Sequence, residues 1–276
     1  MGVVEGKVAF ITGLARGQGR SHAVRLAEQG ADIIGLDVCA NDPAVEHSLA
    51  TQQDLEETIA LVEKADRRIV ARVADVRNPD AMAEVLEAGV AEFGRLDIVV
   101  AQAGIMPITG EQRRARVAFV TAIDVMLTGV YDTVALSVPH LRAGGNGGSI
   151  VITSSTAGLV GGLSDGTPGV MGYIAAKHGV VGLMRAWANV LAPDRIRVNT
   201  IHPTGVNTPM VANECFGRFV QEMPEIAANL VNPLPVPNGM LEPGDVTDTL
   251  MHLVSDAGKY ITGTTVVVDA GFTNRK

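Results

Sequence analysis

The sequence is short of cysteine, of aromatic residues and of positive charge, and these shortages exclude several classes of protein. Lysine and arginine total 22 against 30 aspartate and glutamate residues, and the net charge of −8 provides no basic surface for nucleic acid or anionic lipid. The two cysteines, Cys39 and Cys215, form no Cys-x-x-Cys pair, which favours a reduced protein without disulfide bonds. We therefore expect a cytoplasmic protein with no nucleic-acid partner.

Long hydrophobic runs and targeting signals are also missing. The longest uncharged stretch, 143–164, is broken by glycines and a Ser/Thr cluster, so it lacks the continuous apolar face of a membrane span. The first residues include Glu5 and Lys7 and lead directly into a strand-like run, with no signal-peptide pattern. The six histidines show no metal-ligand spacing. We expect neither a membrane partner nor a metal site.

Short β-branched runs recur along the chain and predict parallel strands. Aromatic residues make up only 4% of the sequence, as expected for aliphatic strands buried on both faces beneath closely packed helices. Most of the runs are separated by amphipathic stretches long enough to cross back over a sheet. The pattern predicts an α/β protein with a single-domain Rossmann fold over 1–276, in which helices cover both faces of a doubly wound, seven-stranded parallel sheet. The predicted strands are 8–12, 32–36, 69–73, 97–101, 149–153, 195–201 and 264–268.

A glycine-rich turn, residues 12–19, connects the first strand to the first helical pattern. Gly13 allows a positive φ, Gly17 lets a pyrophosphate approach bare backbone N–H groups, and Gly19 permits close helix–strand packing. A P-loop is excluded because no Gly-Lys-Ser/Thr follows. The turn therefore predicts a dinucleotide-binding site.

The choice of dinucleotide depends on two residues with opposite effects. Asp37 ends the second strand, 18 residues after Gly19, where its carboxylate can accept both ribose hydroxyls and repel a 2′-phosphate. Arg16 can pair with a 2′-phosphate, but the direct contact of Asp37 favours NAD. Asp75 closes the third strand, where it can contact adenine or cap the strand end.

One tyrosine has the spacing of an activated acid–base group. Tyr173 is followed by Lys177, so a helix places both side chains on one face and the ammonium favours the phenolate, lowering a pKa that begins near ~10. Ser155 follows the end of the fifth strand and offers a hydroxyl donor at the carboxyl edge of the sheet. These residues predict general acid–base catalysis.

Taken together and in this order, the motifs resemble the classical short-chain dehydrogenase/reductase family over essentially the whole chain. The resemblance implies that Tyr173 exchanges the substrate proton, Lys177 holds the nicotinamide ribose and tunes Tyr173, and Ser155 binds the carbonyl oxygen. It also implies a homotetramer. The cofactor-binding residues that it implies are Gly13, Arg16, Gly17, Gln18, Gly19, Asp37, Asp75, Val76, Gln102, Ala103, Gly104, Tyr173, Lys177, Pro203, Val206 and Thr208.

Two segments interrupt the alternation of strands and helices. The polar segment 38–53 follows the strand end that holds the adenosine, so we expect it to be an insert that folds over the adenine, with a solvated loop as the alternative. The segment 207–240 carries five prolines, which exclude a long helix and predict a substrate-binding loop with short helical pieces.

The insert and the segments 15–23 and 175–185 resemble the mycofactocin-associated, carveol-dehydrogenase-like subfamily. That resemblance implies oxidation of alcohols, firmly held NAD and an external electron acceptor. The chain departs from the family at Gln102, where asparagine is usual, and at Met126, where an asparagine usually serves a proton relay. A thioether cannot replace the donor and acceptor of an amide.

The sequence therefore predicts an NAD-dependent oxidoreductase acting on a secondary alcohol or ketone, with terpenoid, carveol-like substrates in view. Two alternatives remain: a dinucleotide-binding protein without catalysis, suggested by Met126, and an NADP-dependent ketoreductase. We interpret His22 as a helix-start residue, His202 as structural and Arg113 as part of a solvated helix start.

Overall fold

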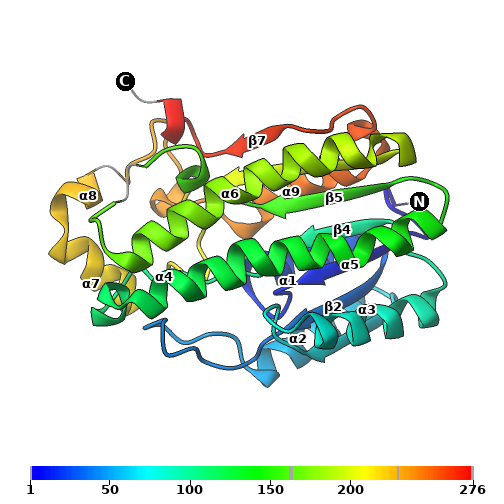
Figure 1. Cartoon of the computed structure of the whole chain (residues 1–276), viewed down its shortest axis with the longest axis horizontal. Coiled ribbons are helices and arrows are strands. Elements are labelled where there is room, and N and C mark those ends of the chain that lie inside the picture. Colours follow the sequence, from blue (N-terminus) through cyan, green and yellow to red (C-terminus); the bar gives the residue numbers. More distant parts are fainter. Residues whose placement is uncertain (1, 162–163, 229, 275–276) are drawn as a thin grey trace.

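The computed structural model describes residues 2–161, 164–228 and 230–274, within which the chain forms seven strands and nine α-helices (Figure 1). The strands are β1 (Val8–Thr12), β2 (Asp32–Asp37), β3 (Ile69–Val73), β4 (Ile98–Ala101), β5 (Gly148–Thr153), β6 (Ile196–Pro203) and β7 (Thr265–Val268). The helices are α1 (Gly17–Glu28), α2 (Gln52–Lys64), α3 (Pro79–Phe93), α4 (Arg116–Ile123), α5 (Gly129–Ala143), α6 (Pro168–Leu191), α7 (Glu214–Glu222), α8 (Pro224–Ala228) and α9 (Pro243–Val254).

The strands form one parallel sheet in the order β3-β2-β1-β4-β5-β6-β7, which confirms the predicted doubly wound sheet. The chain builds outward from β1 in one direction and then returns to add β4 on the other side. In open α/β sheets, such a reversal leaves a crevice outside the carboxyl ends of the strands, where ligands bind. The topology therefore indicates a ligand site at the carboxyl ends of β1 and β4.

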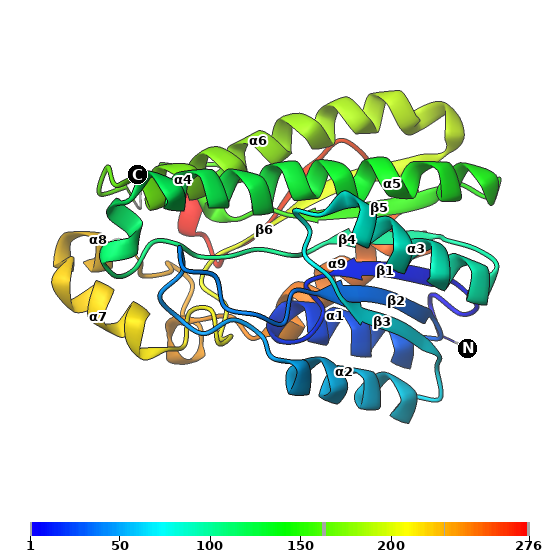
Figure 2. The same cartoon turned by 60° about the horizontal axis from the view of Figure 1, so that its bottom comes forward.

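Successive strand residues enter two separate hydrophobic cores, because side chains alternate across a sheet. In β1, Phe10 belongs to the core beneath α3, α5 and α6, whereas Ala9 and Ile11 belong to the core beneath α1, α2 and α9. Figure 2 shows α5 and α6 on one side of the sheet and α1 and α2 on the other. Strands covered on both faces are rich in apolar side chains, as β1 and β4 are, whereas the edge strand β3 is less buried and carries Arg72.

Local signals define where several helices begin and end. Asn78 caps α3 by accepting a hydrogen bond from Ala81 N, and Gly94 ends that helix in a left-handed conformation with φ of 77°. Thr51 and Asp54 form a reciprocal capping box at the start of α2. Because α2 begins at Gln52, the predicted insert 38–53 extends two residues into this helix.

The predicted substrate-binding loop, 207–240, contains the short helices α7 and α8, as its prolines indicated, and Asn229 within it lies outside the described residues. Within the described part of the chain, one helical stretch, Arg116–Ala143, passes for a membrane-crossing helix by length and composition. Half of its most apolar window is buried inside the protein, as in the core helices that pass the same test. A π-helical turn, η2 (Asp124–Thr128), joins α4 to α5 within this stretch.

Candidate active site

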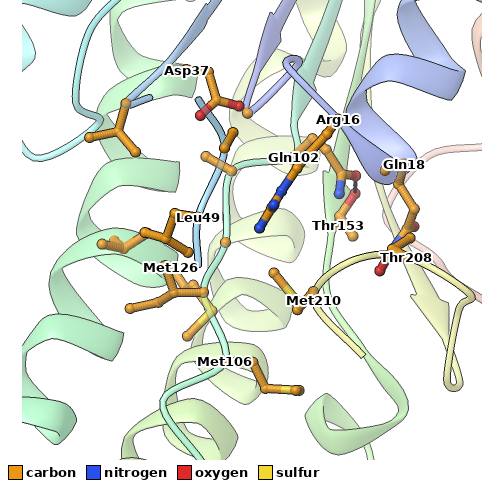
Figure 3. A pocket seen from close by; sticks show the side chains of 18 of the residues that line it. Arg16, Gln18, Asp37, Leu49, Gln102, Met106, Met126, Thr153, Thr208 and Met210 are labelled. Carbon is orange, nitrogen blue, oxygen red and sulfur yellow. Dashed lines mark hydrogen bonds between the residues drawn. The ribbon is translucent and has the colours of Figure 1, made fainter. Parts of the chain in front are cut away.

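A cavity opens at the carboxyl edge of the sheet, at the reversal between β1 and β4. All the predicted catalytic and cofactor-binding residues line it, except Gly19. Figure 3 shows Asp37 at one end of the cavity and Met106 at the other, with Arg16 and Gln102 between them. The sequence motifs, which are spread from the first strand to the loop after β6, thus meet around one space.

The glycines of the turn after β1 serve close approach. Gly13 has φ of 71°, and a Cβ there would lie 2.7 Å from the Cα of Ala103. A Cβ on Gly19 would collide with the carbonyl oxygen of Gly13. Gly19 therefore allows α1 to pack closely against the turn, as predicted, and its place among the cofactor contacts stays a prediction.

The start of α1 fits the pyrophosphate of a dinucleotide. Arg16, at the N-cap, makes no side-chain capping hydrogen bond, so backbone N–H groups of the first turn remain for an anion. Gln18 lines the cavity, and its Oε1 is buried with no hydrogen-bond partner in the described residues. An uncapped helix start is what a bound phosphate group would use, whereas the unpartnered Oε1 of Gln18 would need a donor such as a hydroxyl or an amide N–H.

Asp37 is held in place at the end of β2. Its Oδ2 accepts a hydrogen bond from Ala15 N at 3.0 Å, and only 8% of the residue is exposed. Burial raises the pKa of Asp37, while hydrogen bonds from Ala15 and Cys39 and the charge of Arg16 act to lower it. A carboxylate in this position accepts hydroxyl groups and repels a phosphate.

The insert borders the same end of the cavity and is anchored at two points. The guanidinium of Arg16 donates to Ser48 O at 2.5 Å, which joins the insert to the dinucleotide turn. Arg77, after β3, pairs with Asp42 of the insert at 2.8 Å and with Asp75 at 2.6 Å. The side chain of Asp75 therefore braces a loop, although the residue also lines the cavity.

Ser155, Tyr173 and Lys177 come together from β5 and α6. Ser155 follows the end of β5, and its Oγ accepts a hydrogen bond from Ala157 N at 3.2 Å. Tyr173 and Lys177 lie one turn apart on α6, and the Lys177 Nζ is 5.9 Å from the centre of the Tyr173 ring. The Lys177 amine donates to Thr153 O at 2.8 Å. A hydroxyl, a phenol and an amine thus face one cavity.

Burial controls the protonation of this group. It lowers the pKa of Lys177 to about 8 and raises the pKa of Tyr173, with a hydrogen bond to Ser155 opposing the latter shift. The raised pKa of Tyr173 is opposite to the direction predicted from its spacing to Lys177. The reason is that desolvation of the phenolate outweighs the hydrogen bond to Ser155.

His202 supports the group from β6, in agreement with the structural role predicted for it. Its Nδ1 lies 2.8 Å from Ser155 O, and its Nε2 lies 2.8 Å from Thr200 Oγ1. A ring nitrogen facing a carbonyl oxygen must donate, so the Nδ1 of His202 carries a proton. The histidine therefore fixes the backbone that carries Ser155.

Of the two residues that depart from the family pattern, Met126 adjoins Lys177 and Gln102 contacts Thr153. A Cβ on Gly104 would lie 3.7 Å from Met126 Sδ and 3.8 Å from Lys177 Nζ, so the thioether and the amine border the same point. Met126 is fully buried, in the π-helical turn η2. Gln102 uses its Oε1 to accept a hydrogen bond from Thr153 Oγ1 at 2.5 Å.

The end of the cavity away from Asp37 is apolar. Met106 belongs to a small hydrophobic cluster against which Tyr173, Met210, Val211 and Phe216 pack. Met106, Met210 and Val211 also line the cavity beside Tyr173. Met210, Val211 and Phe216 belong to the predicted substrate-binding loop 207–240, whereas no sequence pattern singled out Met106, which comes from a loop distant in the chain.

Two residues that we interpreted as local features are instead buried in tertiary contacts. Arg113 is 4% exposed, pairs with Asp165 at 3.2 Å and lies over the ring of Phe219 at 5.8 Å. His22 is fully buried in α1 and bonds to Thr247 Oγ1 at 2.8 Å. Arg113 is therefore not solvated, and His22 is not simply a helix-start residue. Among the described residues, no three His, Cys, Asp or Glu side chains gather to hold a metal ion.

Comparison with known proteins gives a consistent relationship over the whole chain. A family model described as enoyl-(acyl carrier protein) reductase matches residues 13–273. An uncharacterized oxidoreductase of Mycobacterium tuberculosis is 52% identical over 274 residues, covering 99% of this chain and 98% of the relative. The (−)-trans-carveol dehydrogenase of Rhodococcus erythropolis is 45% identical over 291 residues, covering 99% of both chains. The crystal structure of carveol dehydrogenase from Mycobacterium avium in complex with NAD matches with a TM-score of 0.91 at 43% identity, covering 100% of both chains.

Proposed function

The chain belongs to the short-chain dehydrogenase/reductase family, and we propose that it transfers a hydride between a secondary alcohol, or its ketone, and NAD, with Tyr173 as the acid–base group. The observation that carries the proposal is that Ser155, Tyr173 and Lys177 face the cavity that the dinucleotide turn also lines. Two related structures, from Mycobacterium avium and Mycobacterium paratuberculosis, were solved with NAD, which supports NAD as the cofactor.

Different residues around the cavity would bind different parts of the cofactor. Asp37 would accept the adenosine ribose hydroxyls, the start of α1 would hold the pyrophosphate, and Lys177 would bind the nicotinamide ribose. Pro203, at the end of β6, and Val206 and Thr208, which follow it, would border the nicotinamide. When bound, NAD supplies the hydride acceptor of alcohol oxidation and, when reduced, the hydride donor of the reverse reaction.

The remaining groups handle the proton and the substrate oxygen. Ser155 Oγ donates a hydrogen bond to that oxygen, and Tyr173 Oη takes the proton from an alcohol or gives one to a ketone. Because burial raises the pKa of Tyr173, its hydroxyl is protonated at neutral pH and ready to serve ketone reduction. Alcohol oxidation needs the proton removed first, so its rate should rise with pH.

The apolar end of the cavity indicates the substrate class. Met106, Met210 and Val211 provide a surface without charge beside Tyr173, which suits an alicyclic or terpenoid body with one hydroxyl. Methionine side chains adapt their shape to irregular ligands. A carveol-like secondary alcohol fits this description, and one relative carries that activity in its name.

The insert and the edge of the sheet support two further parts of the proposal. The insert folds over the adenosine end of the cavity and slows the release of NAD, so that purified protein retains NAD. An external acceptor then removes the electrons from the reduced cofactor. The protein assembles as a homotetramer, and Val267 on the terminal strand β7 is 41% exposed, as a subunit contact would require.

A substrate screen tests the function. Purified protein is given terpenoid, steroid and simple secondary alcohols, with free NAD, with NADP and with an artificial electron acceptor. We expect oxidation of an apolar alicyclic alcohol with NAD or with the acceptor. NAD binding without turnover of any alcohol or ketone would favour a non-catalytic binding protein, and a preference for NADP would favour a ketoreductase.

A further inference from the structure

Arg113 forms a buried ion pair outside the group that faces the cavity. It lies in the 3₁₀ turn η1 (Glu111–Arg114), and its Nε lies 3.2 Å from Asp165 Oδ2. Its Nη1 also donates a hydrogen bond to Gly110 O at 2.9 Å. Only 5% and 6% of the two paired side chains are exposed. Because desolvation of two buried charges offsets most of their attraction, the pair adds little stability by itself, and what it defines is a geometry.

On one side, the pair is fixed to the start of α6, the helix that carries Tyr173. Asp165 Oδ1 accepts hydrogen bonds from the backbone N–H of Thr167 at 2.9 Å and from its hydroxyl at 2.6 Å, and Thr167 is the N-cap of α6. Gly169, in the first turn of α6, packs closely against η1, because a Cβ there would lie 3.1 Å from the Cα of Arg113. The guanidinium of Arg113 is therefore held in one place.

On the other side, Arg113 faces α7 of the substrate-binding loop. The central carbon of its guanidinium lies 5.8 Å from the centre of the Phe219 ring, and Phe219 is only 2% exposed. A guanidinium is attracted to an aromatic face most strongly where water is excluded. Figure 2 shows α7 at the same end of the molecule as the start of α4, which follows Arg113 closely in the chain. Arg113 thus provides a seat for α7.

The start of α7 is bonded to the wall of the cavity. Asn213, the N-cap of α7, accepts a hydrogen bond from Phe216 N through its Oδ1. Its Nδ2 donates to Pro209 O and to Met210 O, each at 2.9 Å. Pro209 and Met210 both line the cavity, and Phe216 packs against the hydrophobic cluster at its apolar end. The position of α7 therefore sets the position of this wall.

We propose that Arg113 is a positioning residue for substrate selection. Held by Asp165, it seats Phe219 and thereby fixes the wall at Met210 against which the apolar body of an alcohol packs. A fixed wall favours an alcohol whose body fills the apolar end, and it gives less advantage to a small alcohol that leaves this end empty. This role rests on the proposed function, because it concerns the substrate of that same site.

The first test observes the wall directly and does not depend on activity. Spectra of the full-length protein with ¹³C-labelled methionine methyl groups report on each methionine, and Met210→Leu and Met82→Leu variants identify two of the signals. We expect Phe219→Leu, which keeps an apolar side chain without the aromatic face, to shift the Met210 signal. The signal of Met82, which is fully buried in α3, should stay in place. An unshifted Met210 signal overturns the link between the seat of α7 and the wall.

The second test measures substrate selection. Steady-state kinetics compare carveol, a large alicyclic alcohol, with 2-propanol, a small one. We expect Phe219→Leu and Arg113→Lys, which keeps the charge opposite Asp165 but not the flat guanidinium, to raise the KM for carveol about 3- to 10-fold. The KM for 2-propanol, the kcat and the Kd for NAD should change less than about twofold. Arg114→Gln is the matched control, because this neighbouring arginine is exposed and pairs with Glu111 on the same turn.

The double variant separates a role through Phe219 from a general loss of packing. If Arg113 acts through the ring, Arg113→Lys has no further effect in a Phe219→Leu protein, so the KM for carveol of the double variant stays within about twofold of either single variant. Multiplying effects, or equal rises in KM for carveol and 2-propanol, would show a loss of packing and overturn the positioning role. An unchanged KM for carveol in Phe219→Leu overturns it even if Arg113→Lys does not fold.

The failure of Tyr173→Phe to reduce activity would instead overturn the proposed function. The methionine spectra do not depend on turnover, so they would still show whether Phe219 holds α7 and the wall at Met210 in place.

Discussion

Glu46 and Arg218 form an ion pair of 2.6 Å that joins the insert to α7 of the substrate-binding loop, across 172 positions of sequence. Burial alone would raise the pKa of Glu46, but Arg218, with help from Thr109 and Cys215, lowers it. The insert also packs tightly against the loop after β4, because a Cβ on Gly110 would lie 2.7 Å from the Glu46 carboxyl carbon. The insert and the substrate-binding loop, which both line the cavity, are thus tied together.

Breaking this tie should speed the exchange of NAD. The side chain of Arg218 is 52% exposed and that of Glu46 is 22% exposed, so the pair contributes only modestly to holding the two segments together. We therefore expect Glu46→Gln or Arg218→Gln to raise the release rate of NAD about two- to fivefold. High salt should act in the same direction on the wild-type protein. Stopped-flow displacement of NAD measures the rate.

The control for this prediction is Arg114→Gln, which breaks the exposed Glu111–Arg114 pair without touching the insert or α7. Its release rate should equal that of the wild-type protein. Equal release rates in all three variants would show that the insert and the loop open independently. Free exchange within milliseconds in the wild type would remove the retention of NAD altogether.

Asp37 should decide the choice between NAD and NADP. Asp37→Ser removes a buried carboxylate that can accept ribose hydroxyls, so we expect the Kd for NAD to rise about 10- to 100-fold and the relative affinity for NADP to improve. Titration with both dinucleotides measures the preference, with the exposed Asp80→Asn as the control for a lost negative charge. If Asp37→Ser keeps the preference for NAD over NADP, other residues determine that preference, and Arg16 is the first candidate.

Met126 should limit the proton relay. Met126→Asn places an amide beside Lys177, and we expect a higher kcat or a broader pH range, because an amide provides the donor and acceptor that a thioether lacks. Met126→Leu keeps the volume without the amide and should leave kcat near the wild-type value. If Met126→Asn lowers activity below that of Met126→Leu, Met126 belongs to a repacked site and does not limit a proton relay.

The strands were predictable because each is a local pattern under one strong constraint. A strand covered on both faces is rich in apolar side chains, and all seven predicted runs match strands of the sheet. The first and last residues of the strands were harder to predict, because each depends on the backbone conformation of one residue. Arg195, for example, takes φ of 59° and ends the turn before β6, so the strand begins at Ile196 and not at the predicted residue 195.

The site was predictable where a residue belongs to a motif and unpredictable where its partner is distant. Arg113 gave no sign of burial because Asp165 lies 52 positions away. His22 did carry a signal: with Gly19, Ala23 and Leu26 it shares the spacing of the buried face of α1. The helical spacing of these apolar positions by itself predicts that His22 lies in the core.

The burial of His22 makes a prediction about acid stability. Its pKa is about 4 in the folded protein and 6.5 when unfolded, so as pH falls between these values the unfolded chain binds a proton that the folded chain rejects. The free energy of unfolding should therefore fall by up to about 3 kcal/mol from this residue alone. Urea unfolding at pH 7 and pH 4 should show a smaller loss in His22→Gln. Equal losses in the two proteins would contradict the shift.

The role of Tyr173 is the central claim, and Tyr173→Phe tests it most directly because only the phenolic oxygen is lost. The measurement is the rate of a single turnover of hydride transfer, with the Kd for NAD measured on the same preparation. We expect the rate to fall by about 10²- to 10⁴-fold, the usual contribution of a general acid–base group, and the Kd to change less than about twofold. A near-normal rate in the variant would remove Tyr173 from the mechanism and contradict the proposed function of the site.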